Sequence, residues 1–161
     1  MSDPTVPGKP KTIVVGLGND FRSDDGAGLA VLRLLGSRNI SGVHLVELRD
    51  DLTKLLDHLQ DVTCAYIIDA VQSGSPPGTI HRIEATGEHF SPKNLPRSTH
   101  GLSLPHLLEL ARLQGEIPKK LVIYGVEGER FGYGDTMTQA VHEAVARVVD
   151  SIHTELERDL L

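Results

Sequence analysis

A glycine-rich segment joins the first strand-like stretch of this chain to its first helix-like stretch. Residues 12–15 (Thr-Ile-Val-Val) form a short apolar run typical of a buried strand, and residues 29–35 are largely apolar, as in a buried helix. Between them, residues 16–28 hold four glycines and the adjacent pair Asp24 and Asp25. A strand that passes through a glycine-rich turn into a helix indicates an α/β fold.

The two aspartates restrict what this turn can bind. A phosphate at the start of the helix would meet two negative charges, so the segment is a poor nucleotide-binding turn. Paired carboxylates beside glycines suit a cation or acid–base catalysis better. Gly26 and Gly28 each cost about 1 kcal/mol relative to alanine inside a helix, which indicates that another backbone approaches closely. Asp25 is therefore a candidate functional residue, whereas Asp24 is explained equally well as part of the helix start.

The remaining chain alternates between strand and helix patterns. The expected strands cover residues 12–17, 43–48, 65–68, 79–84 and 121–126, and the expected helices cover 24–36, 51–59, 102–113 and 136–157. We expect Ser23 to cap the first helix and Gly36 to end it. The connection before 79–84 is too short for a crossover helix, so this strand should be antiparallel and at an edge.

This order predicts one α/β domain over residues 11–161, after a disordered lead-in over 1–10. The domain should be a sandwich in which about five strands form a mostly parallel, twisted sheet with helices on both faces. Such sheets gather ligands at the carboxyl ends of their strands.

Composition excludes several classes of function. A chain of 161 residues with a net charge of −6 is an unsuitable nucleic-acid partner. Its single cysteine, Cys64, rules out an internal disulfide and suits a reducing compartment. We find no signal peptide and no apolar run long enough for a bilayer, so we expect a cytoplasmic protein with no membrane partner. No apolar stripe stands out as exposed, which favours a monomer.

Three candidate ligands emerge from the expected strand ends and loops. Asp69 directly follows an apolar strand, where a carboxylate is poorly solvated and needs a partner. Asp25 and the loop at Glu127 should lie at the same edge of the sheet. His100 stands between a long loop and a helix, where an imidazole could be a ligand, a base or simply a surface residue. Together, Asp25, Asp69 and His100 form an O,O,N set that suits nickel or zinc. We interpret Cys64 as a small core residue.

Four motifs occur in an order that resembles the hydrogenase maturation endopeptidases. They are Gly18-Asn19 followed by Asp24-Asp25-Gly26-x-Gly28, then Ile68-Asp69-Ala70, Thr99-His100, and Gly125-Val126-Glu127. The resemblance spans about residues 11–150. It implies an aspartyl-type endopeptidase that removes the C-terminal extension of a nickel-iron hydrogenase large-subunit precursor after nickel has been inserted.

The resemblance also implies roles for the three candidates. Asp25, Asp69 and His100 map onto the family's metal-contacting positions, and Asp25 or Asp69 would activate water. The nickel would be supplied mainly by the precursor, and no organic cofactor is implied. Two alternatives stay open: a non-catalytic nickel-site chaperone or scaffold for hydrogenase assembly, and a Rossmann-like enzyme of small molecules.

Overall fold

The computed structural model describes residues 11–49, 51–85, 91, 95–96 and 104–160. The strands are β1 (Thr12–Leu17), β2 (Val43–Leu48), β3 (Cys64–Val71), β4 (Ile80–Glu84) and β5 (Lys120–Glu127). The helices are η1, a 3₁₀ turn (Ser23–Gly26), α1 (Ala27–Ser37), α2 (Lys54–Leu59), α3 (Leu104–Leu113) and α4 (Gln139–Asp159). The lead-in predicted over residues 1–10 and the candidate His100 lie outside the described residues.

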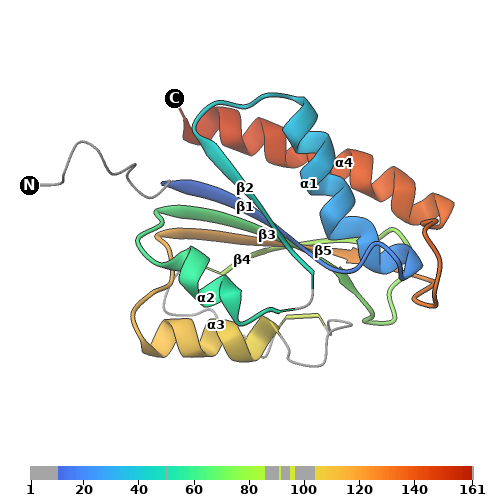
Figure 1. Ribbon diagram of the computed structural model, residues 1–161, viewed down its shortest axis with the longest axis horizontal. Coiled ribbons are helices and arrows are strands. Elements are labelled where there is room, and N and C mark those ends of the chain that lie inside the picture. Colours follow the sequence, from blue (N-terminus) through green and yellow to red (C-terminus); the bar gives the residue numbers. More distant parts are fainter. Residues whose placement is uncertain (1–10, 50, 86–90, 92–94, 97–103, 161) are drawn as a thin grey trace, which may run out of the picture.

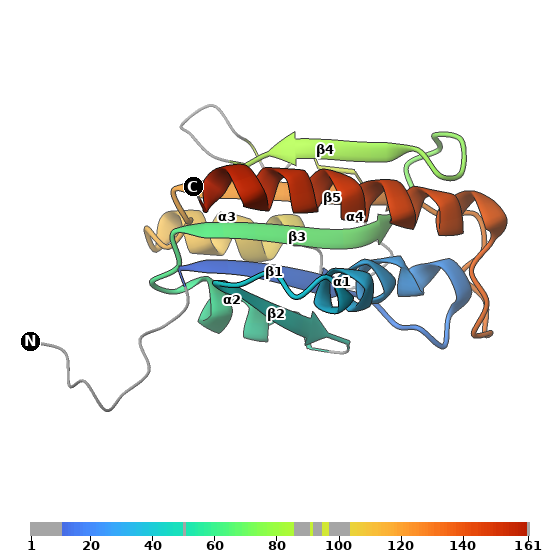
Figure 2. The ribbon, with the colours of Figure 1, turned by 90° about the horizontal axis from the view of Figure 1, so that it is seen from above.

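The five strands form one sheet in the order β2-β1-β3-β5-β4. Every neighbouring pair is parallel except β4 with β5, so β4 is the antiparallel edge strand that the short connection predicts. Figure 1 shows α1 and α4 on one face of the sheet and α2 and α3 on the other, and Figure 2 shows β4 and β2 at the two edges. The predicted fold class is confirmed.

Burial on both faces explains the apolar character of the central strands. Every residue of β1 and β3 is buried, as expected for strands that lie between two helical layers. Alternate side chains of these strands enter two separate cores. One core packs Val14, Tyr66 and Ile68 against α1 and α4, and the other packs Ile13, Val15 and Ile67 against α2 and α3. Among the described residues, none of the helices is both long and apolar enough to span a bilayer.

The first helix begins later than its sequence pattern indicates. Ser23 is not an N-cap: it opens the 3₁₀ turn η1 at a left-handed φ of 53°, and α1 starts only at Ala27. The Ser23 hydroxyl instead donates to the carbonyl oxygen of Gly132, 2.9 Å away. Contacts with this distant loop therefore override the local capping signal. Gly36 does not end α1, which continues to Ser37.

β3 is longer than predicted and extends to Val71, so Asp69 is a strand residue and does not follow the strand. Its register with β5 explains the extension, because Asp69, Ala70 and Val71 pair with Gly125, Val126 and Glu127.

Candidate active site

The candidate site lies where the chain leaves β1 and β3 in opposite directions. From β1 the chain passes through α1 to β2, and from β3 it continues toward β4 and β5 on the other side. At such a point the connecting loops diverge and leave a crevice beyond the carboxyl ends of the strands, which is where α/β sheets bind ligands. Asp25 and Asp69 come from these two segments.

Asp25 is held by the turn that precedes α1. It belongs to η1 and is 5% exposed. Its Oδ2 atom accepts the backbone N–H of Asn19 at 3.1 Å, and its carbonyl oxygen accepts the same N–H at 3.2 Å. Gly18 makes this closure possible, because a Cβ at its φ of 140° would lie 2.0 Å from the Asp25 carbonyl oxygen. The glycines of this segment therefore allow close backbone packing, as the sequence indicates.

Asp69 lies in a narrow and largely apolar crevice and is 1% exposed. Gly125, its partner in β5, and Leu104 and Pro105 of α3 also line this crevice. The start of α3 thus borders the same space as the carboxylate, and the positive end of a helix favours a negative charge. A buried carboxylate in such surroundings is costly unless it has partners.

The segments that carry the two carboxylates pack directly on one another. The turn η1 contacts β3. A Cβ on Gly28 would lie 2.4 Å from the carbonyl oxygen of Leu17 and 2.6 Å from that of Ile68, the residue before Asp69. Asp25 and Asp69 therefore belong to one neighbourhood at the carboxyl rim. Their roles in catalysis and metal contact stay predictions, as does that of His100.

In the part of the chain that the structure describes, no group of three His, Cys, Asp or Glu side chains converges as a metal site. The two candidate ligands that the structure describes, Asp25 and Asp69, are both carboxylates, which are suitable but incomplete ligands for a divalent ion.

Asp24 has a structural role that its sequence position does not reveal. It is fully buried, and its Oδ2 atom accepts the backbone N–H groups of Glu129 and Arg130, both at 2.9 Å. Its Oδ1 atom accepts the N–H of Thr138 at 2.7 Å, and the Thr138 hydroxyl also donates to the carboxylate. Asp24 thus fastens the loop between β5 and α4 to the first loop. No sequence signal marks this pairing across more than a hundred residues.

Glu127 organises the other side of the rim. It is 1% exposed and accepts the backbone N–H of Ser73 at 2.8 Å, the Ser73 hydroxyl, and Nε2 of His81 at 3.3 Å. Burial alone would raise the pKa of Glu127, but these hydrogen bonds outweigh burial and hold it below its usual value. Sequence reasoning placed Glu127 at this rim but missed Ser73 and His81. The side chain fixes the turn that follows β3, the strand of Asp69.

Cys64 begins β3 at the opposite rim and is buried. Burial, followed by the charge of Asp159, raises the pKa of its thiol to about 11. The side chain is therefore a neutral thiol at pH 7, in agreement with its interpretation as a core residue.

Comparison with known proteins places this geometry in context. Residues 39–155 match a family model described as hydrogenase maturation protease. The chain is 30% identical over 152 residues to the hydrogenase 2 maturation protease of Escherichia coli, covering 88% of the chain and 90% of that protein. It is 28% identical over 137 residues to the hydrogenase expression/formation protein HoxM of Azotobacter vinelandii, covering 82% of the chain but 65% of that protein. The chain thus spans just under two thirds of HoxM.

Solved structures agree in fold. The hydrogenase maturating endopeptidase HybD from E. coli superimposes with a TM-score of 0.80 at 25% identity, over 92% of this chain and 93% of that one. The [NiFe] hydrogenase maturation protease HybD from Thermococcus kodakarensis superimposes with a TM-score of 0.74 at 24% identity, over 91% of this chain and 99% of that one. Both matches cover more than nine tenths of this chain.

Proposed function

The chain belongs to the hydrogenase maturation protease family, and from this membership we propose that it is an endopeptidase that trims a hydrogenase precursor. Its substrate is the large-subunit precursor of a nickel-iron hydrogenase, from which it removes the C-terminal extension. We place this activity in the cytoplasm. The observation that carries the proposal is the packing of η1 on β3, which brings two buried carboxylates to one rim of a family-like fold.

The chemistry follows from the carboxylate pair. Hydrolysis adds the oxygen of water to the scissile carbonyl carbon, breaks the carbon–nitrogen bond and delivers a proton to the leaving amine. A carboxylate can accept the proton of the attacking water and return it to the amine. We assign this acid–base work to Asp25 and Asp69 together. The narrow crevice at Asp69 excludes bulk water, which strengthens electrostatic effects there.

Nickel enters the proposal as part of the substrate. Asp25, Asp69 and His100 contact the nickel that the precursor already holds, so the metal marks a precursor that is ready for cleavage. Two carboxylates and an imidazole are acceptable ligands for this ion but would bind it weakly alone. The requirement for both surfaces makes recognition selective for the loaded precursor.

Processing assays with conservative variants test the proposal. Purified protein is incubated with nickel-loaded precursor, and the product is weighed by mass spectrometry. Asp25→Asn and Asp69→Asn remove a charge but keep the side-chain shape, so each should lower the cleavage rate at least about a hundredfold. Asp57→Asn, at an exposed position of α2, is the matched control and should cleave normally.

Two results would contradict the proposal. Folded Asp25→Asn and Asp69→Asn variants that both cleave at the normal rate would show that neither carboxylate takes part. Wild-type protein that binds the precursor without shortening it would indicate a nickel-site chaperone.

A further inference from the structure

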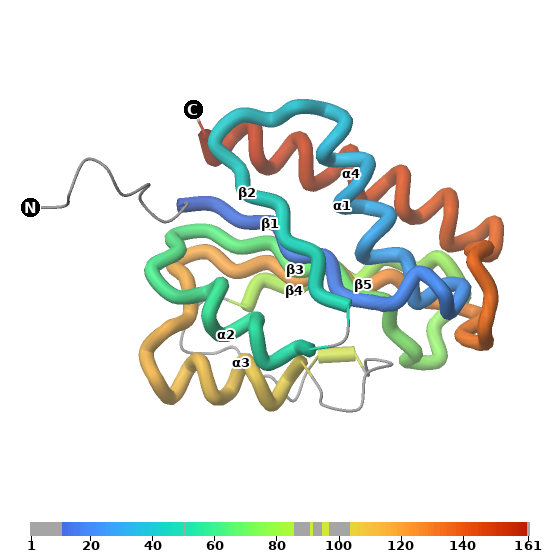
Figure 3. Tube along the Cα trace, in the orientation of Figure 1, coloured from blue at the N-terminus to red at the C-terminus, as the bar shows by residue number. Residues whose placement is uncertain are grey.

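Two loops at the carboxyl rim are joined by hydrogen bonds into one surface, which we call the two-loop platform (residues 19–24 and 129–135). Ser23 donates its backbone N–H to Gly134 at 2.8 Å, and Gly134 donates to Phe21 at 2.9 Å. The N–H of Asp24 donates to Arg130 at 2.9 Å. Figure 3 shows the two segments side by side at one end of the molecule. The buried Asp24 carboxylate joins the same two segments, because it accepts the backbone N–H groups of Glu129 and Arg130.

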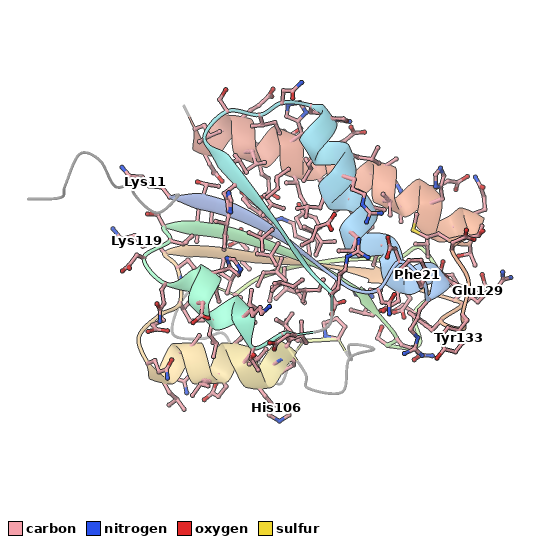
Figure 4. The ribbon with its side chains drawn as sticks, viewed as in Figure 1. Lys11, Phe21, His106, Lys119, Glu129 and Tyr133 are labelled. Atoms are coloured by element: carbon pink, nitrogen blue, oxygen red, sulfur yellow. The ribbon has the colours of Figure 1, made fainter. Side chains whose placement is uncertain are left out.

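The platform carries two exposed aromatic side chains. Phe21 is 65% exposed and Tyr133 is 96% exposed. The chain has only three Phe and three Tyr residues and no Trp, and both Tyr66 and Tyr124 are buried. Figure 4 shows Phe21 and Tyr133 at the same end of the molecule, far from Lys119, which precedes β5 at the opposite rim. Large, solvent-exposed aromatic side chains beside a candidate site are typical of a surface that binds another protein.

The hydrogen bonds between the two loops hold the backbone of the two-loop platform in place before a partner binds. Aromatic side chains on a fixed backbone lose little conformational freedom on association, and aromatic residues dominate the binding energy of many interfaces. On the exposed part of the platform, Arg22 and Arg130 offset Glu129 and Asp135, so its charges are mixed. Its binding energy should therefore come from apolar contact and depend little on salt.

The geometry points to the folded body of the precursor as the partner that rests on the platform, an inference that depends on the proposed function. The crevice at Asp69 is small and Asp69 is 1% exposed, so a folded domain cannot enter it. When the cleavage segment reaches this crevice, the folded remainder of the substrate must stay outside, against the surrounding rim. Phe21 is four residues from Asp25, so the platform is part of that rim.

Steady-state cleavage of the nickel-loaded precursor by the full-length protein tests this assignment. Phe21→Ala and Tyr133→Ala should each raise KM about tenfold, because each removes an apolar anchor. Tyr133→Phe should restore the wild-type KM, since the ring provides the contact. Leu113→Ala is the matched control: Leu113 is 69% exposed at the end of α3, near the opposite rim, and its loss should leave KM unchanged.

The outcomes separate this inference from the proposed function. If wild-type protein cleaves the precursor and both alanine variants keep KM within twofold, the platform is not a docking surface, while the proposed function stands. Wild-type protein that cannot cleave would overturn both. Analytical ultracentrifugation adds a further check. If the wild-type protein is a dimer and Phe21→Ala is a monomer, the platform binds a second copy of this chain, which would contradict the inference.

Discussion

Asp24 and Asp25 are adjacent residues with different environments. Asp24 is enclosed by N–H donors from Glu129, Arg130 and Thr138 and by the Thr138 hydroxyl. Asp25 is held by the N–H of Asn19 at the start of the same loop. The first aspartate therefore connects two loops, and the second is placed by its own loop at the rim. This separation lets one carboxylate secure the backbone on which the other is positioned.

We predict that Asp24→Asn destabilises the protein by about 2–3 kcal/mol, because its new amide group would face a backbone N–H wherever it points. Thr138→Val, which removes one hydroxyl donor and keeps every N–H, should cost about 1 kcal/mol. Urea unfolding followed by circular dichroism measures both. Equal stability of Asp24→Asn and wild type would contradict a structural role for this carboxylate.

The residues of the site differ in how far their sequence revealed them. Asp25 and Asp69 could be selected because a carboxylate beside glycines or inside an apolar run conflicts with local preference. Asp24 looks identical to Asp25 in sequence, and only its contacts with a loop more than a hundred residues away distinguish it. The prediction of Ser23 as a helix cap was wrong for a similar reason. Its hydroxyl donates to Gly132, and local propensity carries no information on such a distant partner.

Helix α1 packs closely against β1 and β3. Gly28 lies against the carbonyl groups of Leu17 and Ile68, with no room for a Cβ. Among the described residues, a Cβ added to Gly36, near the end of the same helix, would meet a side-chain carbon of Leu45 at 3.4 Å, an ordinary van der Waals contact. The close packing at Gly28 fixes the distance between η1 and β3 and hence between the segments of Asp25 and Asp69.

Gly28→Ala should therefore destabilise the protein by about 3 kcal/mol or more, because the backbone of a strand or helix must move. Gly36→Ala should be neutral or should stabilise by up to about 1 kcal/mol, because alanine has the higher helix propensity and the last turn of α1 has room for its methyl group. Thermal unfolding of the two variants gives the comparison. If Gly28→Ala unfolds at the same temperature as Gly36→Ala, α1 does not pack on the strands as described.

The C-terminal helix α4 is joined to the sheet by polar contacts that are partly buried at Tyr66 and Tyr124 and exposed at Arg82 and Lys120. Glu155 accepts hydrogen bonds from the Tyr124 hydroxyl and from Arg82 of β4. Asp159 accepts the Tyr66 hydroxyl and, at 3.0 Å, the Lys120 ammonium. Burial alone would raise the pKa values of Glu155 and Asp159, but these donors outweigh it and hold both pKa values below their usual range.

This anchoring predicts a loss of stability in acid. A carboxyl group whose pKa is lowered by folding stabilises the native state at pH values above its pKa in the unfolded chain, which is near 4.5 for Glu and 3.8 for Asp. Stability should thus be fully present at pH 7 and should fall as the pH drops below about 5. Urea unfolding between pH 7 and pH 3 measures the slope, which Glu155→Gln should reduce. An identical slope in that variant would contradict a role for Glu155.

Strand and helix positions could be predicted because apolar runs and helical spacing are local signals. Their ends could not. β3 gains Asp69, Ala70 and Val71 from pairing with β5, and α1 loses its first turn to contacts with the loop at Gly132. Both differences arise from partners far along the chain. The order of the strands in the sheet likewise depends on long-range pairing.

The proposed function requires the family fold, a carboxylate pair and a metal carried by the substrate. The protein should contain little nickel after purification and should bind added Ni²⁺ or Zn²⁺ weakly, since the proposed ligands are few and come from separate segments. Chelator-resistant zinc at one ion per chain would instead indicate a self-contained metalloprotease.

The most direct measurement compares nickel-loaded with nickel-free precursor by intact mass after incubation with the purified protein. We expect the loaded precursor to lose its C-terminal extension while the nickel-free precursor keeps its full mass, even when free nickel is given to the protein alone beforehand. Equal shortening of both precursors would contradict nickel recognition. An unchanged mass for the loaded precursor would contradict the peptidase assignment itself.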